Sequence, residues 1–247
     1  MRCFGKTDKG LKRKTNQDFF RIFMCKTYAL AVVCDGMGGA KGGSTASRTA
    51  AVEFMKSVRN ALTLSDMNRI TSGDIERILV NSLNKANAAV YEKAGTSDAL
   101  DGMGTTLVGF LYCHGKTFVI NTGDSRLYAF LGGKATQITK DHSFVQYLVD
   151  NGTISELEAE NHPQKNIILK VIGVNESAEC DVFTVDDYDY LLLCSDGLSN
   201  LVTKDEMANI VTEEMDEETK VNILIDLANE RGGSDNITAV VFRRNDN

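Results

Sequence analysis

Residues 105–138 read TTLVGFLYCHGKTFVINTGDSRLYAFLGGKATQI and contain four short apolar segments, TTLVGFLY, KTFVIN, RLYAF and KATQI. The joints between them, CHG, TGDS and LGG, are only a few residues long. Parallel neighbours need a crossover of about a dozen residues or more, so joints this short predict antiparallel strands in a meander. The sequence therefore predicts that part of the core is an antiparallel sheet.

Further strands and helices are expected on both sides of this region. The strand segments, rich in Val, Ile, Leu, Phe or Tyr, are residues 19–24, 28–34, 180–185, 189–194 and 237–243. The expected helices cover residues 74–93, 217–230 and about 43–60. Strand runs interrupted by helices indicate an α+β layered fold rather than a doubly wound parallel one.

Two of these helices have clear sequence signals. In residues 74–93 an apolar face recurs at helical spacing, with Ser72 and Asp74 available as caps. Its members are Ile75, Leu79, Leu83, Ala86 and Val90. The later helix has inward positions and is expected to end at Gly232 and Gly233, where a left-handed turn forms easily. These inward positions are Val221, Leu224, Ile225 and Ala228.

Composition indicates one domain spanning residues 1–247. The chain has 43% hydrophobic residues, a single proline and no low-complexity linker. Its formal net charge of −7 argues against nucleic acid as a partner. The first fourteen residues form no secretory signal, and no apolar run is long enough to span a bilayer. We therefore expect a cytoplasmic protein without membrane attachment, and a monomer, because no interface signal is evident.

Four aspartates stand at predicted strand ends beside glycine or serine. Asp35, Asp124 and Asp196 follow strands, and Asp235 precedes one. If the strands alternate in direction, these acids gather at one edge, where their mutual repulsion requires a positive charge. Carboxylate and backbone oxygens favour Mg²⁺ or Mn²⁺ over Zn²⁺, and two such ions activate water for hydrolysis. The same D-G, G-D-S and S-D-N sequences are also ordinary turns, so spacing alone leaves both readings open.

Seven ordered blocks carry a more specific signal. They are RKTNQD (13–18), VCDGMGG (33–39), GMGTTLVG (102–109), NTGDSRLY (121–128), TKDHS (139–143), CSDGLSN (194–200) and GGSDNIT (232–238). In this order and at these separations the chain resembles the metal-dependent protein phosphatases, the type 2C serine/threonine phosphatases, in their compact bacterial form. The resemblance implies a central sandwich of two antiparallel sheets flanked by helices on both outer faces, in agreement with the layered fold.

The resemblance also implies site residues. Asp35 matches the acid that bridges two metal ions, and the Gly36 carbonyl matches a ligand of one of them. Asp196 and Asp235 match ligands of the second ion, and Asp124 with Asp196 matches a weaker third site. By the same resemblance, Asp18 holds metal-bound water and Arg13 grips the substrate phosphate, for which a planar guanidinium is suited.

Two residues depart from the family pattern. Met37 stands where many members have a histidine proposed as general acid, and a thioether cannot donate a proton. Aryl phosphates, whose leaving groups are less basic, should suffer less from this loss. Gln17 stands where many relatives have glutamate, so a water-mediated contact to metal is expected to be weaker.

The sequence thus predicts a phosphatase for phosphoserine and phosphothreonine proteins, acting by direct attack of a hydroxide that bridges two Mn²⁺ or Mg²⁺ ions. Its expected biological counterpart is a eukaryotic-type serine/threonine kinase. Residues 144–178 correspond to the family's flap beside the cleft, where substrate preference is expected to lie. The main alternative is a pseudophosphatase that keeps the fold as a binding module, and the intact acids argue against it.

Overall fold

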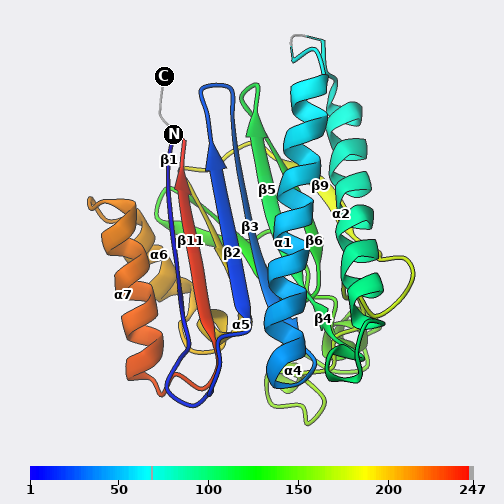
Figure 1. Cartoon of the computed structure of the whole chain (residues 1–247). Coiled ribbons are helices and arrows are strands. Elements are labelled where there is room, and N and C mark those ends of the chain that lie inside the picture. Colours follow the sequence, from blue (N-terminus) through cyan, green and yellow to red (C-terminus); the bar gives the residue numbers. More distant parts are fainter. Residues whose placement is uncertain (68, 245–247) are drawn as a thin grey trace.

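The computed structural model describes residues 1–67 and 69–244 as two antiparallel sheets stacked between helices (Figure 1). The five-stranded sheet has the order β1 (Arg2–Asp8), β11 (Ile237–Arg243), β10 (Tyr190–Cys194), β7 (Arg126–Leu131) and β8 (Lys134–Gln137). The other sheet has the order β2 (Asp18–Met24), β3 (Tyr28–Met37), β5 (Leu107–Cys113), β6 (Lys116–Thr122) and β9 (Asp181–Val185), and β4 (Gly104–Thr105) pairs with β3.

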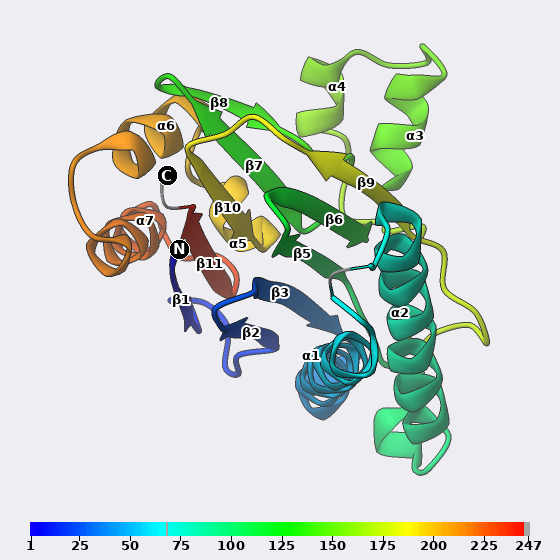
Figure 2. The same ribbon diagram turned by 90° about the horizontal axis from the view of Figure 1, so that it is seen from above.

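Helices cover the outer face of each sheet, which confirms the predicted sandwich with helices on both sides (Figure 2). The helices α1 (Gly39–Leu64) and α2 (Ser72–Ala94) pack on the six-stranded sheet. The other sheet is covered by α5 (Asp196–Ser199), α6 (Lys204–Thr212) and α7 (Glu217–Glu230). Two short helices, α3 (Phe144–Asp150) and α4 (Glu156–Glu160), lie outside these layers (Figure 2). A short 3₁₀ turn at Asp98–Leu100 follows α2.

The strand β3 shows why the central run of the sequence is almost continuously apolar. Ala29, Ala31 and Val33 belong to the cluster between the two sheets. The alternate residues Leu30 and Val32 belong to the cluster under α1 and α2. Successive side chains of a strand point to opposite faces, so a strand covered on both faces needs apolar residues at every position.

The predicted helices are confirmed, with small differences at their ends. All five predicted inward residues of α2 are buried, as are the four of α7. Gly232 and Gly233 adopt positive φ after α7, as the sequence indicated. The N-cap of α2 is Thr71, whose side chain and that of Asp74 form a reciprocal capping box, while Ser72 is already helical. The helix α1 extends beyond the predicted 43–60 at both ends.

The expectation of one continuous meander over residues 105–138 is wrong at its middle joint. β5 pairs with β6, and β7 pairs with β8, so two hairpins do form. However, β6 and β7 belong to different sheets, and the chain crosses between them at residues 123–125. Gly123 has a φ of 108°, and a Cβ atom there would lie 2.5 Å from Thr106 Cγ2. This joint is a corner between two sheets. A short polar sequence is compatible with either such a corner or a hairpin, so the sequence did not distinguish them.

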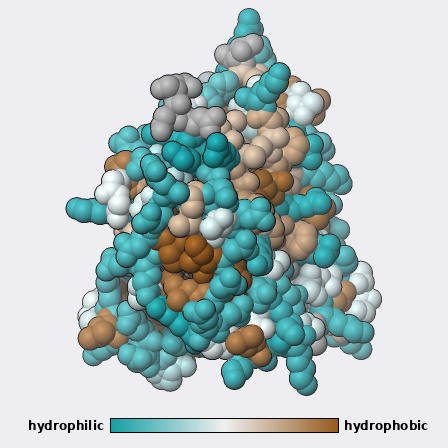
Figure 3. Space-filling model, turned by 90° about the vertical axis from the view of Figure 1, so that its left-hand side faces the viewer, coloured by the Kyte–Doolittle hydropathy of each residue, from teal (hydrophilic) through white to brown (hydrophobic). Residues whose placement is uncertain are grey.

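The surface shows no membrane-spanning element among the described helices, because none is long and apolar enough to cross a bilayer. Figure 3 shows the side that bears α6 and α7. Hydrophilic groups dominate this face and surround a hollow in which apolar groups gather. Several exposed large hydrophobic residues lie in the region of α3 and α4 and in the segment after it, and others are spread over the rest of the described surface. Those in this region are Tyr147, Leu157, Ile167, Leu169 and Val174.

We predict that Phe242→Ala destabilises the protein by about 3–5 kcal/mol, because a large buried ring is lost from the cluster between the sheets. Phe242 contacts the ring of Phe110 at a centroid distance of 4.7 Å and packs near Tyr112 and Tyr188. Urea unfolding measures the change. The control Tyr147→Ala, at a side chain that is 56% exposed, should stay within about 0.5 kcal/mol of the parent. Equal losses in both variants would contradict this packing.

Candidate metal centre

The five predicted acidic residues come from strand ends and lie near one another. Asp18 and Asp35 are directly paired in the register of β2 and β3. The charges of Asp18, Asp124, Asp196 and Asp235 all act on Asp35, which places their carboxylates around it. Both sheets therefore contribute acids to one cluster, as the strand-end argument predicted.

The backbone of Asp35 is held in place by two threonines from the GMGTT block. The Asp35 amide donates to Thr106 Oγ1 at 2.9 Å, and Thr105 Oγ1 donates to the Asp35 carbonyl at 2.8 Å. Burial, followed by the charges of Asp18 and Asp196, raises the pKa of Asp35 well above its usual range. The ionised form of Asp35 is thus disfavoured by its surroundings and would be stabilised by a bound cation.

Asp18 is almost fully buried and is fixed from one side only. Its Oδ2 atom accepts hydrogen bonds from Ser195 Oγ and Thr238 Oγ1, each at 2.6 Å. Its Oδ1 atom has no hydrogen-bond partner among the described residues. Burial raises the pKa of Asp18 to about 6, although the two hydroxyl donors oppose this change. One oxygen is therefore anchored, and the other is available for a ligand.

Asp124 lies at the corner where the chain crosses between the sheets. His142 fixes this corner, because its Nδ1 accepts from the Gly123 amide at 3.1 Å and its Nε2 lies 3.0 Å from Asp181 Oδ2. An accepting Nδ1 requires the neutral ring with its proton on Nε2, which can donate to Asp181. His142 thus has a structural role at this corner. Burial and the charge of Asp196 raise the pKa of Asp124 to about 7.

Asp196 and Asp235 lie against each other across the end of the five-stranded sheet. A Cβ atom on Gly197 would lie 2.0 Å from the Asn236 carbonyl oxygen, so glycine permits this close approach. Burial, together with the charge of Asp235, raises the pKa of Asp196. The Asp196 Oδ1 atom is buried without a hydrogen-bond partner among the described residues.

Arg13 is attached to this cluster through Asp235. Its Nη2 atom lies 2.7 Å from Asp235 Oδ2, and its side chain is 52% exposed. The hydrogen bond to Asp235 raises the pKa of Arg13, and the charges of Asp35 and Asp196 act in the same direction. Arg13 is thus a cation at the mouth of an acidic cluster, where a guanidinium can meet an incoming anion.

Gly36 and its neighbours pack closely against the start of α1. A Cβ atom on Gly36 would lie 2.0 Å from the Gly43 carbonyl oxygen. The Gly36 amide donates to the Gln17 carbonyl, and the Gln17 side-chain amide donates to the Gly39 carbonyl at 2.6 Å. Gln17 therefore braces the glycine-rich turn between β3 and α1.

The donor set fits hard divalent cations. It consists of carboxylate oxygens and the Gly36 carbonyl, and two buried carboxylate oxygens, on Asp18 and Asp196, have no partner in the described part of the chain. Oxygen ligands of this kind suit Mg²⁺ and Mn²⁺. As they stand, the described side chains include no group of three or more His, Cys, Asp or Glu residues arranged to hold one ion. Mutual repulsion and the Arg13–Asp235 ion pair act against closer approach of the carboxylates.

The sequence reasoning missed the residue that ties the Arg13 loop to the cluster. Asn236 Oδ1 accepts from the Gln17 amide at 2.8 Å, and its Nδ2 donates to the carbonyls of Lys9 and Thr15. Asn236 is 3% exposed. The signal was present in the GGSDNIT block, where a polar residue directly follows Asp235 and precedes a buried strand. Ser195 and Thr238, which hold Asp18, were missed in the same way.

The proposed flap is joined to the body of the protein near this cluster. Thr105 and Ile172 exchange two backbone hydrogen bonds, at 3.0 and 2.9 Å. Asn87 of α2 accepts from the Gly173 amide at 2.8 Å and donates to the carbonyls of Asn175 and Glu176. The same segment contains the short helices α3 and α4.

Comparisons with known proteins agree on one family. A family model described as Protein phosphatase 2C matches residues 11–229. The serine/threonine phosphatase stp of Listeria welshimeri is 37% identical over 243 residues, which are 97% of this chain and 94% of that protein. A crystal structure of a bacterial serine phosphatase has a TM-score of 0.89 at 35% identity and covers 100% of this chain and 99% of its own.

A second similar solved structure contains bound metal ions. The catalytic domain of the serine threonine protein phosphatase PstP, in complex with two manganese ions, is similar with a TM-score of 0.77 and 32% identity. The match covers 97% of this chain and 96% of that one.

We predict that Asn236→Ala loosens the loop of residues 9–17, because three hydrogen bonds to its backbone are lost. The free energy of unfolding should fall by about 2–3 kcal/mol, since three part-buried hydrogen bonds are lost and each contributes about 0.5–1.5 kcal/mol. Trypsin should cut this lysine- and arginine-rich loop faster in native protein. The control Asn84→Ala, at an exposed position of α2, should change neither result. Unchanged cleavage in Asn236→Ala would contradict the assigned role.

We predict that the metal-free protein loses stability as the pH rises from about 4 to about 7. The pKa of Asp124 is raised from 3.8 to about 7, so in this window the native state binds more protons than the unfolded state. Stability therefore falls as the pH rises through the window. Urea unfolding in EDTA at a series of pH values measures this slope. Asp124→Asn should reduce the slope and exposed Asp226→Asn should not, and equal slopes would contradict the prediction.

Proposed function

This chain belongs to the protein phosphatase 2C family and is a metal-dependent protein serine/threonine phosphatase, and we propose that its reaction takes place at the carboxylate cluster around Asp35. The observation that supports this location is the convergence of four further acids and one arginine on a single half-buried carboxylate. Hydrolysis of a phosphoester needs both features, because the phosphoryl group is anionic and its attacking water must be deprotonated.

We propose that Asp35, the Gly36 carbonyl, Asp196 and Asp235 hold two divalent cations, and that Asp124 with Asp196 forms a weaker third site. Bound Mn²⁺ or Mg²⁺ supplies Lewis acidity, which lowers the pKa of water and offsets the charge of the phosphoryl group. The raised pKa values of Asp35 and Asp196 support this assignment, because a cation would restore the ionised form of each carboxylate. The charges of four other acids act on Asp35, which suits a bridging position.

Asp18 and Arg13 have positioning and binding roles in this proposal. Asp18 is anchored through Oδ2, so its free Oδ1 can accept a hydrogen bond from water and orient it toward the substrate. Arg13 exchanges its hydrogen bond with Asp235 for contacts to the substrate phosphate, since a guanidinium binds phosphate oxygens in pairs. Its exposure allows this exchange without unfolding of the loop.

Met37 suggests that the rate of hydrolysis depends on the leaving group of the substrate. It lies at the end of β3, half-buried and paired with Gly104, and its thioether cannot protonate a departing alkoxide. Protonation from solvent must serve for alkyl phosphates, whereas an aryl leaving group needs little assistance. We propose that the enzyme acts on phosphoserine and phosphothreonine. For aryl phosphates, departure of the leaving group should contribute a smaller barrier.

The cellular setting is part of the same proposal. We infer that the whole chain forms one catalytic domain, that it acts as a monomer in the cytoplasm, and that its substrates include those of a serine/threonine kinase. Support comes from the cluster of buried residues that joins the two sheets and from relatives of nearly the same length. A pseudophosphatase that only binds phosphoproteins would not need every core acid, and all of them are present here.

Release of phosphate from a phosphothreonine peptide tests this function, with EDTA, Mg²⁺ or Mn²⁺ added in turn. We expect release only with metal, and a loss of about a hundredfold or more in Asp35→Asn. Calorimetric titration with Mn²⁺ gives a second readout, in which the wild type binds and Asp35→Asn binds weakly or not at all. The control Asp226→Asn, on the exposed face of α7, should match the wild type in both.

Two results would contradict the proposal. Normal Mn²⁺ binding and turnover in Asp35→Asn would place the reaction elsewhere in the molecule. Absence of release by folded wild-type protein with every metal would favour the binding-module alternative.

A further inference from the structure

The strand β2 lies at an edge of the six-stranded sheet. β2 pairs with β3, and no other strand of the described residues pairs with its opposite side. Alternate N–H and C=O groups of an edge strand point away from the sheet and can pair with another chain. The open edge therefore offers a ready site for an additional strand.

A groove runs between this edge and α1. It has a volume of about 740 Å³, and its walls come from β2 and from positions of α1 that recur every three or four residues. Such positions lie on one helical face. The lining residues are Phe20, Arg21, Ile22, Phe23, Val52, Met55, Lys56, Arg59, Asn60 and Thr63. A groove bounded by an edge strand and a helix is the geometry in which strand addition binds an extended peptide.

The groove is basic, although the chain as a whole is acidic. Arg21, Lys56 and Arg59 line it without any acidic residue, while the formal net charge of the chain is −7. Arg59 lies over the Phe23 ring at 3.8 Å, and neither Arg21 nor Arg59 has an ion-pair partner among the carboxylates of the described residues. Lys56 makes only a long 3.5 Å contact with Glu53. These cations are therefore available to an acidic ligand.

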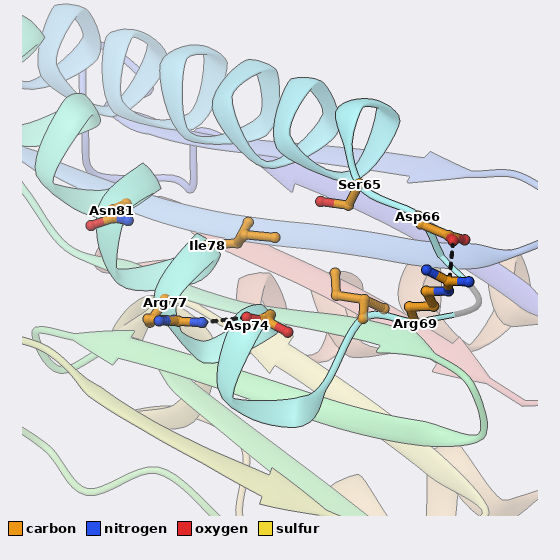
Figure 4. Close-up of a pocket in the computed structure, with 8 residues that line it drawn as sticks. Ser65, Asp66, Arg69, Asp74, Arg77, Ile78 and Asn81 are labelled. Carbon is orange, nitrogen blue, oxygen red and sulfur yellow. Dashed lines mark hydrogen bonds and ion pairs between the residues drawn. The ribbon is translucent and has the colours of Figure 1, made fainter.

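A second hollow, between the C-terminal end of α1 and the start of α2, differs in this respect (Figure 4). It has a volume of about 510 Å³ and contains two arginines. Arg69 pairs with Asp66 at 3.6 Å, and Arg77 pairs with Asp74. The charges of that hollow are balanced within it, which leaves the β2 groove as the basic site with unbalanced charge.

We propose that the β2 groove binds an extended, acidic segment of a partner protein, which adds to the sheet as a strand beside β2. Phe20 and Ile22 face the cluster between the sheets, whereas Phe23 faces α1. Arg21 shares the face of Phe23, because side chains alternate along a strand. A ligand that alternates apolar and acidic residues would therefore place its apolar groups beside Phe20 and Ile22 and its carboxylates beside the three cations.

The length of the groove sets the length of the ligand. The α1 positions from Val52 to Thr63 extend about 17 Å along the helix axis. An extended chain covers this distance with about five residues. Arg21 is three residues along β2 from Asp18, or about 10 Å, so binding here does not require the groups assigned to catalysis. The proposal is independent of the proposed function.

Fluorescence anisotropy with labelled peptides tests the proposal on the full chain. The probe is the heptapeptide Val-Glu-Val-Glu-Val-Glu-Val, and its lysine counterpart Val-Lys-Val-Lys-Val-Lys-Val is the charge control. We expect the acidic probe to bind and the basic one to bind at least about tenfold more weakly. Hydrogen exchange monitored by NMR should show that the acidic probe protects the outward amides of residues 19–24.

Charge reversal in the groove provides the matched variants. Arg21→Glu combined with Lys56→Glu should weaken binding of the acidic probe about tenfold or more. The control Lys85→Glu combined with Lys134→Glu reverses two exposed lysines outside the groove and should bind as the wild type does. Both double variants should keep the wild-type melting temperature and the wild-type hydrolysis of an aryl phosphate, which separates this test from that of the catalytic site.

Three outcomes would overturn the proposal. The acidic probe could fail to bind, it could bind both double variants equally, or it could bind without protecting the β2 amides. Protection of the same amides at high protein concentration without peptide would instead assign the groove to a second copy of this chain.

Discussion

The mutual repulsion of buried carboxylates is the constraint on which the rest of this structure depends. Asp18, Asp35, Asp124 and Asp196 each have a raised pKa, with burial as the largest cause and neighbouring acids as a further one. Such a cluster can persist only if its backbone is held by a rigid scaffold. Two sheets with three apolar clusters provide that scaffold, and each acid stands at the end of an element fixed by them.

Neutral hydroxyl groups hold the acids in place, as hydrogen-bond donors or acceptors, without cancelling their charge. Ser195 and Thr238 bond one oxygen of Asp18, and Thr106 links the Asp35 amide to Ser125 at the corner beside Asp124. Lysine or arginine in these positions would hold the acids more strongly but would remove the negative potential that attracts divalent cations. The hydroxyl residues thus separate the task of positioning from the task of charge balance.

The sequence predicted those helices and strands whose own pattern of apolar residues reflects which of their faces are buried. β3 was recognisable because both of its faces are covered, and α2 because one apolar face recurs at helical spacing. The corner at Gly123 was not, because its course depends on Thr106, which is distant along the chain and packs against it. The strand β1 was also missed, because its partly exposed residues lack a strong apolar pattern and its place follows from pairing with β11.

The site shows the same difference between residues with a local sequence signal and residues fixed by distant contacts. Its acids were identified from their strand-end positions and from the family blocks. The Asn236 contacts join residues more than two hundred positions apart, so the GGSDNIT block contained Asn236 but did not indicate its partners. The distribution of cations is likewise a property of the fold. A chain with a net charge of −7 repels phosphorylated, acidic partners at long range. Recognition of such partners therefore depends on local cations, and the fold gathers these at the Arg13 loop and along the open edge of β2, at two sites joined by a single strand.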